Sequence, residues 1–374
     1  MQHNGTPPAG AQPRVLILSA DIGEGHDLPA RVLAQELEAS QPQARVVVAD
    51  GLKAMGKVIG AIVRDNARVV LRRAPWLFDL QYWLLTHFPP VGWLASTVGR
   101  VFGSSGLLRL IREHDPDVIV STYPGVTEVL GQLRGSGRIS VPVVSAITDL
   151  AGLRYWAHPD VDLHLVTHQE AIDEVERIAG PGTTRWVSGL TSPAFGKPRP
   201  TQEARRALDL PLEGKLVVVS GGGWAVGDLE GATRAVLRRP GTTAVVLAGR
   251  DEVLRSRLQR AFAGDPRARV LGFTDRMSDL LAAADAIIHS TAGLTILEAR
   301  MCGCAPISYG WGVGHIRVNN RAFVRHGLAE VASSAQELDQ ALDRALAQRP
   351  LPDRSLTSLP SAAASVLALV GAAA

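Results

Sequence analysis

Residues 14–26, RVLILSADIGEGH, and residues 215–227, KLVVVSGGGWAVG, decide the fold. Each stretch has an apolar run typical of a buried strand, followed by glycines at the point where the chain turns into a helix. The pattern occurs once in each half of a chain of 374 residues, a length that suits two domains of ordinary size. We therefore expect two copies of a strand, glycine turn and helix.

Further apolar runs alternate with helical patterns along the chain, which predicts α/β domains with parallel sheets covered on both faces. The predicted strands are Arg14–Ser19, Arg45–Ala49, Asp117–Thr122, Val141–Ala146, Asp162–Thr167, Lys215–Ser220, Thr243–Ala248, Ala268–Leu271, Ala286–His289 and Ala305–Tyr309. The predicted helices include Leu28–Ala39, Asp251–Ala263 and Ala335–Ala347. We expect two Rossmann-like domains that face a central cleft and bind ligands at the carboxyl ends of their strands.

Composition sets the predicted domain boundaries. Residues 191–200, TSPAFGKPRP, hold three prolines and a glycine, which is typical of a linker. The linker would separate an N-terminal domain at residues 14–190 from a C-terminal domain at residues 201–349. Residues 1–13 have the composition of a disordered leader, not of a signal peptide. Residues 350–374 predict a tail helix that returns to the N-terminal domain.

Charge, hydropathy and cysteine content exclude several classes of protein. The net charge of +3 is too small to indicate a nucleic-acid partner, and no run of about twenty apolar residues predicts a membrane span. The only cysteines, Cys302 and Cys304, suit small buried thiols in a reducing compartment and not a disulfide or a zinc site. We expect a soluble or peripheral protein, and the sequence leaves its oligomeric state open.

Residues 75–93, PWLFDLQYWLLTHFPPVGW, hold six of the eighteen aromatic residues of the chain. They lie within residues 51–111, a segment with eight Lys/Arg against two acids. Aromatic side chains flanked by arginines suit the headgroup region of an anionic membrane. A buried helical hairpin is the alternative. The predicted membrane-binding residues are Arg68, Arg72, Arg73, Trp76, Phe78, Trp83 and Trp93.

The C-terminal half carries a predicted phosphate site. Glycines at Gly221–Gly223 would let backbone N–H groups approach an anion at a helix start. In residues 290–298, STAGLTILE, the N–H groups of Ala292 to Thr295 would face a diphosphate, and Glu298 would accept hydrogen bonds from ribose hydroxyls. Arg250 would neutralise phosphate. The alternatives are a tight turn, a capped helix with a solvated glutamate and an ordinary surface arginine.

His26 is the candidate general base. It follows Gly23 and Gly25 where a strand passes into a helix, and we expect it to point into the cleft. An imidazole titrates near neutrality and so suits deprotonation of a hydroxyl nucleophile. A helix cap is the alternative role.

The order of these motifs resembles the monogalactosyldiacylglycerol synthase and processive diacylglycerol glucosyltransferase family and, more distantly, the N-acetylglucosaminyltransferase that forms lipid II. The matching pieces run in the same order over roughly residues 14–347. They are Gly23-x-Gly-His26, Ile147-Thr-Asp-Leu150, Gly221–Gly223, Gly249-Arg250, Leu271–Met277, Ala284–Ile288, Gly293–Ala299, Gly314-His315 and Asn319.

This resemblance implies a GT-B glycosyltransferase that moves a hexose, with inversion, from a UDP-sugar to a diacylglycerol-like lipid. It implies a cytoplasmic enzyme on the inner face of the cell membrane that needs no metal or other cofactor. Phe273 would lie beside the uracil, and His26 would be the base. Gly23, Gly25 and Asp149 would lie on the acceptor side. The nucleotide-sugar site would comprise Gly221, Gly222, Gly223, Arg250, Phe273, Ala292, Gly293, Leu294, Thr295, Glu298, His315 and Asn319.

The sequence departs from the family pattern near the donor sugar. A Gly-Gln-Glu motif of the family stands here as Gly314-His315-Ile316, so galactose, glucose and N-acetylglucosamine all stay open. Two other reactions also stay open. One is transfer to a small apolar aglycone by a soluble enzyme. The other is epimerisation of a UDP-sugar, which needs carboxylates on both faces of the sugar, with Asp149 and Glu298 as candidates. A sensor without catalysis would require His26 to face away.

Overall fold

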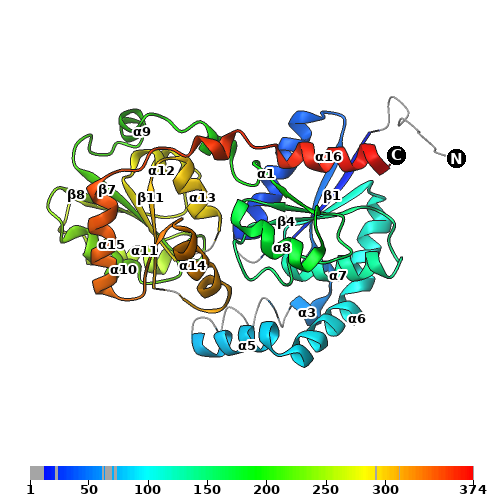
Figure 1. The fold of residues 1–374 in the computed structure, drawn as a ribbon. Helices are drawn as coiled ribbons and strands as arrows, with labels where there is room; N and C mark the ends of the chain where they lie inside the picture. The colour runs from blue at the N-terminus through cyan, green and yellow to red at the C-terminus, as the bar shows by residue number, and fades with distance from the viewer. Residues whose placement is uncertain are drawn as a thin grey trace. The chain divides into compact units, whose positions relative to one another are not determined.

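The computed structural model describes residues 12–21, 24–60, 63, 70, 74–290, 293–310 and 312–373 (Figure 1). The chain divides into unit 1, Met1–Thr191 with Leu359–Ala374, and unit 2, Ser192–Ser358. In the described residues each unit has one six-stranded sheet, and all the paired strands are parallel. The predicted class, two parallel-sheet α/β domains, is confirmed.

Unit 1 has the strand order β2-β1-β3-β4-β5-β6. Its strands are β1 (Arg14–Ser19), β2 (Arg45–Asp50), β3 (Val118–Ser121), β4 (Val143–Ile147), β5 (Leu163–Val166) and β6 (Thr184–Trp186). Its helices are α1 (Glu24–Ser40), α2 (Gly51–Ala54), α3 (Lys57–Gly60), α5 (Pro75–His87), α6 (Pro89–His114), α7 (Pro124–Gly135), α8 (Ile172–Ala179) and α16 (Ala362–Ala373), with the 3₁₀ turn η2 (Gln169–Ala171).

Alternate residues of β1 face two different cores, as expected for a strand buried on both sides. Val15 and Ile17 pack with α1 and α16 on one face, whereas Leu16 and Leu18 pack with α2, α6 and α7 on the other. The near-continuous apolar sequence of β1 follows from this double burial.

Helix α16 completes unit 1 although it lies at the far end of the sequence. Ala362, Ala363 and Val366 are fully buried against α1, and Ser188 N–H donates to Pro360 O at 3.0 Å. The tail predicted at residues 350–374 is divided, because Asp353 pairs with Arg300 of unit 2 at 2.7 Å.

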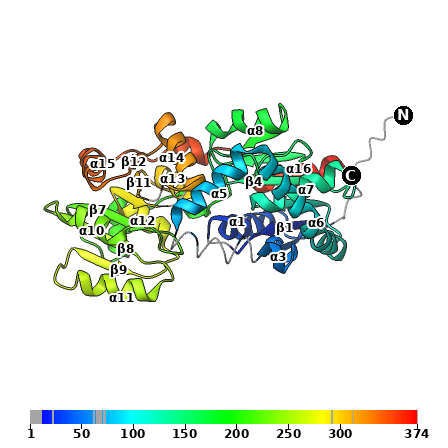
Figure 2. The same cartoon turned by 90° about the horizontal axis from the view of Figure 1, so that it is seen from below.

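Unit 2 has the strand order β12-β11-β10-β7-β8-β9. Figure 2, seen from below, labels β12, β11, β7, β8 and β9 of this sheet in that order. Its strands are β7 (Lys215–Ser220), β8 (Thr242–Leu247), β9 (Ala268–Leu271), β10 (Ala286–His289), β11 (Ala305–Tyr309) and β12 (Glu330–Ala332). Its helices are α9 (Thr201–Ala207), α10 (Leu229–Leu237), α11 (Glu252–Ala261), α12 (Met277–Ala283), α13 (Leu294–Met301), α14 (Gly314–His326) and α15 (Ala335–Ala347), with the 3₁₀ turns η3 (Pro193–Gly196) and η4 (Arg354–Thr357).

All ten predicted strands are present. The ends of β1, β7, β9, β10 and β11 are as predicted, and those of the other five shift by one or two residues. The prediction missed β6 and β12, each three residues long and at a sheet edge. Neither has the continuous apolar run that marks a central strand. Cys302 and Cys304 are buried free thiols, as predicted. Among the described residues, no helix combines the length and apolar composition that crossing a bilayer requires.

Candidate active site

The strands of unit 2 end together at one edge of the sheet. Ser220 of β7 is in register with Leu247 of β8 and with His289 of β10, and His289 is in register with Ser308 of β11. The residues that follow these strands include most of the predicted nucleotide-sugar residues. They share the carboxyl edge of the sheet, where parallel α/β domains bind their ligands.

The glycine-rich turn after β7 is closely packed and requires glycine. A Cβ on Gly221 would lie 2.4 Å from Val226 O, and Gly222 has a φ of +68°. A Cβ on Gly249, after β8, would lie 2.5 Å from Gly222 O, and Arg250 N–H donates to Gly223 O at 3.1 Å. The turn after β7 and the turn after β8 therefore pack directly against each other through their backbones.

Arg250 and Phe273 form a pair at these turns. The guanidinium carbon of Arg250 lies 4.0 Å from the centroid of the Phe273 ring, a cation–π distance. Phe273 is 50% exposed although it is large and apolar. An exposed aromatic face beside a guanidinium suits a base next to a phosphate, the two roles that the resemblance implied for Phe273 and the sequence suggested for Arg250.

Helix α13 begins at the same edge, after β10. Gly293 is its N-cap with a φ of +39°, and Leu294 and Thr295 lie in its first turn. First-turn N–H groups have no intrahelical carbonyl to bond and lie at the positive end of the helix dipole, so an anion is favoured there. Glu298 is only 6% exposed, which excludes the alternative of a solvated glutamate.

Helix α14 carries the last two predicted donor residues. Gly314 starts it with a φ of +53°, and His315 is half-buried in its first turn. Asn319 is fully buried and donates from Nδ2 to His315 O at 2.9 Å. Asn319 therefore holds the turn that carries His315.

Several predicted residues lie outside the described residues. They are Gly23, Arg68, Arg72, Arg73 and Ala292. Gly25 is described and lies inside α1, not in a turn before it, and a Cβ there would meet no atom within 4 Å. The predicted turn geometry is therefore wrong for Gly25, because α1 begins at Glu24, two residues before His26.

His26 of unit 1 lies in the first turns of α1 at the carboxyl edge of its own sheet. Its Nδ1 lies 3.0 Å from Thr122 O, and Thr122 Oγ1 donates back to His26 O at 3.0 Å. A carbonyl oxygen can only accept, so Nδ1 carries the proton in the neutral ring. Nε2 is then the basic nitrogen, which is the tautomer that a general base needs.

Two aromatic rings that the sequence analysis did not select hold the imidazole. Tyr123 makes an edge contact with His26 at 5.1 Å and 86°, and Trp156 lies at 5.7 Å, tilted by 42°. Trp156 is 2% exposed and donates from Nε1 to Asp149 Oδ2 at 3.0 Å. The structure thus brings the predicted residues His26 and Asp149 to the same indole, that of Trp156.

Helix α5 is hydrogen-bonded to the segment of unit 1 that precedes Trp156. Tyr155 Oη donates to Leu85 O at 2.9 Å, and Arg154 Nη1 donates to Thr86 O at 3.0 Å. Burial raises the pKa of Tyr82, and the nearby negative charges of Asp149 and Glu174 raise it further. The inner face of α5 therefore belongs to the surroundings of Asp149.

The outer face of α5 exposes large apolar side chains. Trp76, Leu80 and Trp83 are 67%, 45% and 52% exposed, and their spacing of four and three residues places them on one side of the helix. Trp93, in α6, is 68% exposed, whereas Phe78 is half-buried. The exposure of Trp76, Trp83 and Trp93 excludes the alternative of a buried hairpin for these side chains. Exposed apolar patches mark contact surfaces.

Comparisons with known proteins bear on the family and the fold of this chain. Residues 26–189 match the family model of monogalactosyldiacylglycerol (MGDG) synthase. The predicted family resemblance is confirmed. The processive diacylglycerol β-glucosyltransferase of Bacillus subtilis (strain 168) is 23% identical over 341 residues, covering 89% of this chain and 87% of that protein.

Solved structures show the same fold at low identity. The spinosyn rhamnosyltransferase SpnG has a TM-score of 0.58 and 16% identity over 95% of this chain and 99% of that chain. The Anabaena protein HepE with UDP-glucose has a TM-score of 0.51 and 16% identity, covering 96% and 98%. A putative UDP-N-acetylglucosamine 2-epimerase of Listeria monocytogenes has a TM-score of 0.59 and 12% identity, covering 96% of each. The fold is GT-B.

Proposed function

We propose that this protein transfers a hexose from a UDP-sugar to the hydroxyl group of a diacylglycerol-like lipid, with inversion at the anomeric carbon. The observation that carries the proposal is the hydrogen bond of His26 Nδ1 to Thr122 O, which leaves Nε2 as the base. The match to the monogalactosyldiacylglycerol synthase model covers the residues that hold this imidazole, from His26 to Trp156.

In the proposed reaction, His26 Nε2 takes the proton of the acceptor hydroxyl. The oxygen attacks the anomeric carbon, the bond from that carbon to the diphosphate breaks, and UDP leaves with the electron pair. N–H groups at Gly293 to Thr295 and at Gly221–Gly223, together with the Arg250 guanidinium, would stabilise the charge on the leaving UDP. The chemistry assigned to these groups needs no metal ion.

The donor assignment is supported by the carboxyl edge of unit 2. Phe273 beside Arg250 offers a ring for a pyrimidine and a cation for a phosphate, 4.0 Å apart. The buried carboxylate of Glu298, one turn into α13, offers an acceptor for ribose hydroxyls. HepE has been solved with UDP-glucose on the same fold, which makes a UDP-sugar the first donor to test.

The acceptor assignment is supported by the name of the Bacillus relative, a diacylglycerol glucosyltransferase, and by the exposed face of α5. A lipid acceptor requires the enzyme to meet a membrane surface. Tryptophans that are 67% and 52% exposed on one helix face suit insertion among lipid headgroups. We therefore propose a peripheral protein on the inner face of the cell membrane.

The test offers UDP-glucose, UDP-galactose and UDP-N-acetylglucosamine to the protein with diacylglycerol vesicles. Products are identified by mass spectrometry, and their anomeric configuration by NMR. We expect one glycolipid of β-configuration, formed equally well with EDTA. A product from a small apolar aglycone but not from vesicles would replace the lipid assignment. Solvent deuterium in recovered UDP-sugar would indicate an epimerase instead.

A further inference from the structure

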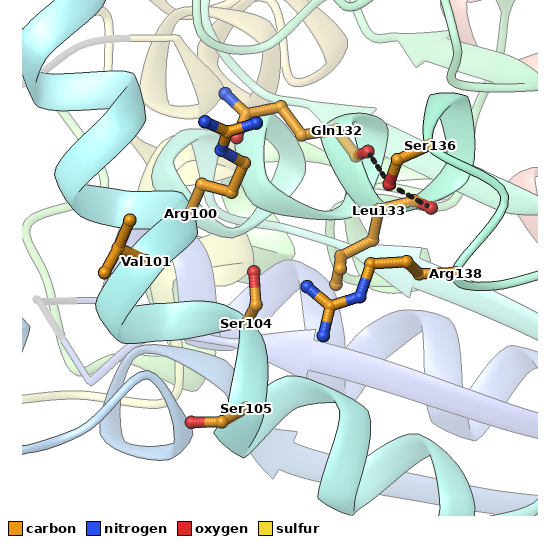
Figure 3. Close-up of a pocket in the computed structure, with 8 residues that line it drawn as sticks. All are labelled: Arg100, Val101, Ser104, Ser105, Gln132, Leu133, Ser136 and Arg138. Carbon is orange, nitrogen blue, oxygen red and sulfur yellow. Dashed lines mark hydrogen bonds between the residues drawn. The ribbon is translucent and has the colours of Figure 1, made fainter.

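Unit 1 contains a cavity of about 330 Å³ between α6 and α7, and its lining includes neither His26 nor a residue of α5 (Figure 3). Arg100, Ser104 and Ser105 of α6 line one side, and Gln132 and Arg138 lie on and just after α7 on the other. Its lining includes no residue of the candidate active site.

The cavity is electropositive. Its lining includes two arginines and no acidic residue. Within the described part of the chain, neither Arg100 nor Arg138 has an ion-pair partner. In contrast, Arg134 of the same helix α7 pairs with Asp162 at 2.9 Å. Two guanidinium groups on one cavity favour an anion, and guanidinium geometry matches the oxygens of a phosphate.

Two polar atoms in the cavity wall also lack partners. Ser104 is 3% exposed, and its hydroxyl has no hydrogen-bond partner among the described residues. Figure 3 shows this hydroxyl in the space that Arg100, Gln132 and Arg138 surround. Gln132 donates from Nε2 to Glu128 Oε1 at 2.8 Å, but within the described chain its buried Oε1 has no donor. A buried polar group without a partner is costly unless a ligand or a water satisfies it.

The end of α7 does not oppose an anion here. The negative end of a helix dipole would repel a phosphate. Ser136 Oγ, however, donates to Gln132 O at 2.7 Å, and Arg138 N–H donates to Leu133 O at 2.9 Å, so these carbonyls are already hydrogen-bonded.

We propose that this cavity binds a phosphate ester that carries a free hydroxyl group. The phosphate would lie between Arg100 and Arg138 and accept a hydrogen bond from Ser104 Oγ. The hydroxyl of the ligand would donate to Gln132 Oε1, which a bare phosphate oxygen could not do. The inference stands independently of the proposed transferase reaction, because none of its residues belongs to that machinery.

Such a group can come from a soluble glycerol phosphate or from the headgroup of phosphatidylglycerol. Val101 lines the cavity and is 62% exposed, and the adjacent Phe102 is 53% exposed. These side chains would contact acyl chains if the phosphate belonged to a lipid.

The test titrates the full-length protein with glycerol 3-phosphate and with propyl phosphate, which lacks the hydroxyls, by calorimetry. Co-sedimentation with phosphatidylglycerol and phosphatidylcholine vesicles forms the second arm. The variants are Arg100→Gln with Arg138→Gln, Ser104→Ala, and the control Arg109→Gln, an exposed arginine of α6 outside the cavity. UDP affinity and thermal melting check that each variant is folded.

We expect glycerol 3-phosphate to bind more tightly than propyl phosphate. The double variant should lose about tenfold or more in affinity, Ser104→Ala several-fold, and Arg109→Gln almost nothing. Binding of phosphatidylglycerol vesicles but not of soluble glycerol 3-phosphate, lost in the same variants, would identify the lipid as the source. Failure of the wild type to bind either form overturns the inference. An equal loss in Arg109→Gln also overturns it, because surface charge alone would then explain the binding.

Discussion

The role of His26 can be separated from its packing by two substitutions. His26→Ala removes both ring nitrogens, whereas His26→Asn keeps an N–H donor close to the position of Nδ1 and can preserve the 3.0 Å bond to Thr122 O. Neither variant has a base at the position of Nε2. If Nε2 is the general base, turnover should fall by about 10²-fold or more in both, which is about 3 kcal/mol in the barrier.

Stability should distinguish the two variants where turnover does not. Both lose the ring contacts with Tyr123 and Trp156, but only His26→Ala loses the hydrogen bond to Thr122 O. The asparagine variant should therefore be more stable by about 1 kcal/mol in urea unfolding. Single-turnover kinetics with saturating donor, and UDP calorimetry as a control, complete the assay. Recovery of turnover in His26→Asn would refute the reasoning, because His26 would then act only by holding Thr122.

Glu298→Gln should weaken UDP binding about tenfold with an unchanged melting temperature, and calorimetry that finds full affinity would exclude the ribose role. Gly249→Ala should destabilise the protein by more than about 1 kcal/mol in urea, since φ is +56° and the new Cβ meets Gly222 O, whereas the control Gly264→Ala, with no atom within 4 Å, should not. Burial lowers the pKa of His164 from 6.5 in the unfolded chain to about 4 in the folded protein. As the pH falls from 6.5 to 4, the unfolded chain binds a proton that the folded protein does not, so the free energy of unfolding falls by about 3 kcal/mol. His164→Gln should flatten this part of the pH profile of urea unfolding. Trp76→Ser with Trp83→Ser should reduce co-sedimentation with neutral and anionic vesicles alike at high salt, and unchanged binding would count against the α5 surface.

Strand positions followed from the sequence because central parallel strands are apolar on both faces. Lys215–Ser220 and Ala286–His289 were predicted with the observed ends. The edge strand β6, Thr184–Trp186, could not be recognised, because its residues are half-buried or exposed and form no continuous apolar run. Its pairing with β5 is set by the neighbouring strand and not by its own pattern.

The candidate site was predictable where a residue type carries the chemistry, as for His26, Arg250 and Glu298. The surrounding contacts were not, because they join distant segments. Trp156 lies 130 residues from His26 in the sequence, and nothing near it signals a ring contact at 5.7 Å or a bond to Asp149. For Gly25, the sequence predicted a feature that the structure does not have. A glycine beside a motif histidine suggested a turn, but α1 begins before it.

The return of α16 to unit 1 has a consequence for synthesis of the chain. Ribosomes release residues in order, so all of unit 2 emerges before Ala362, Ala363 and Val366 can cover α1. Until then Leu33 and Leu37 have an incomplete apolar environment, and unit 1 stays vulnerable to aggregation and proteolysis. A premature stop near residue 360 would therefore damage the half of the protein that was made first and leave the later half able to fold.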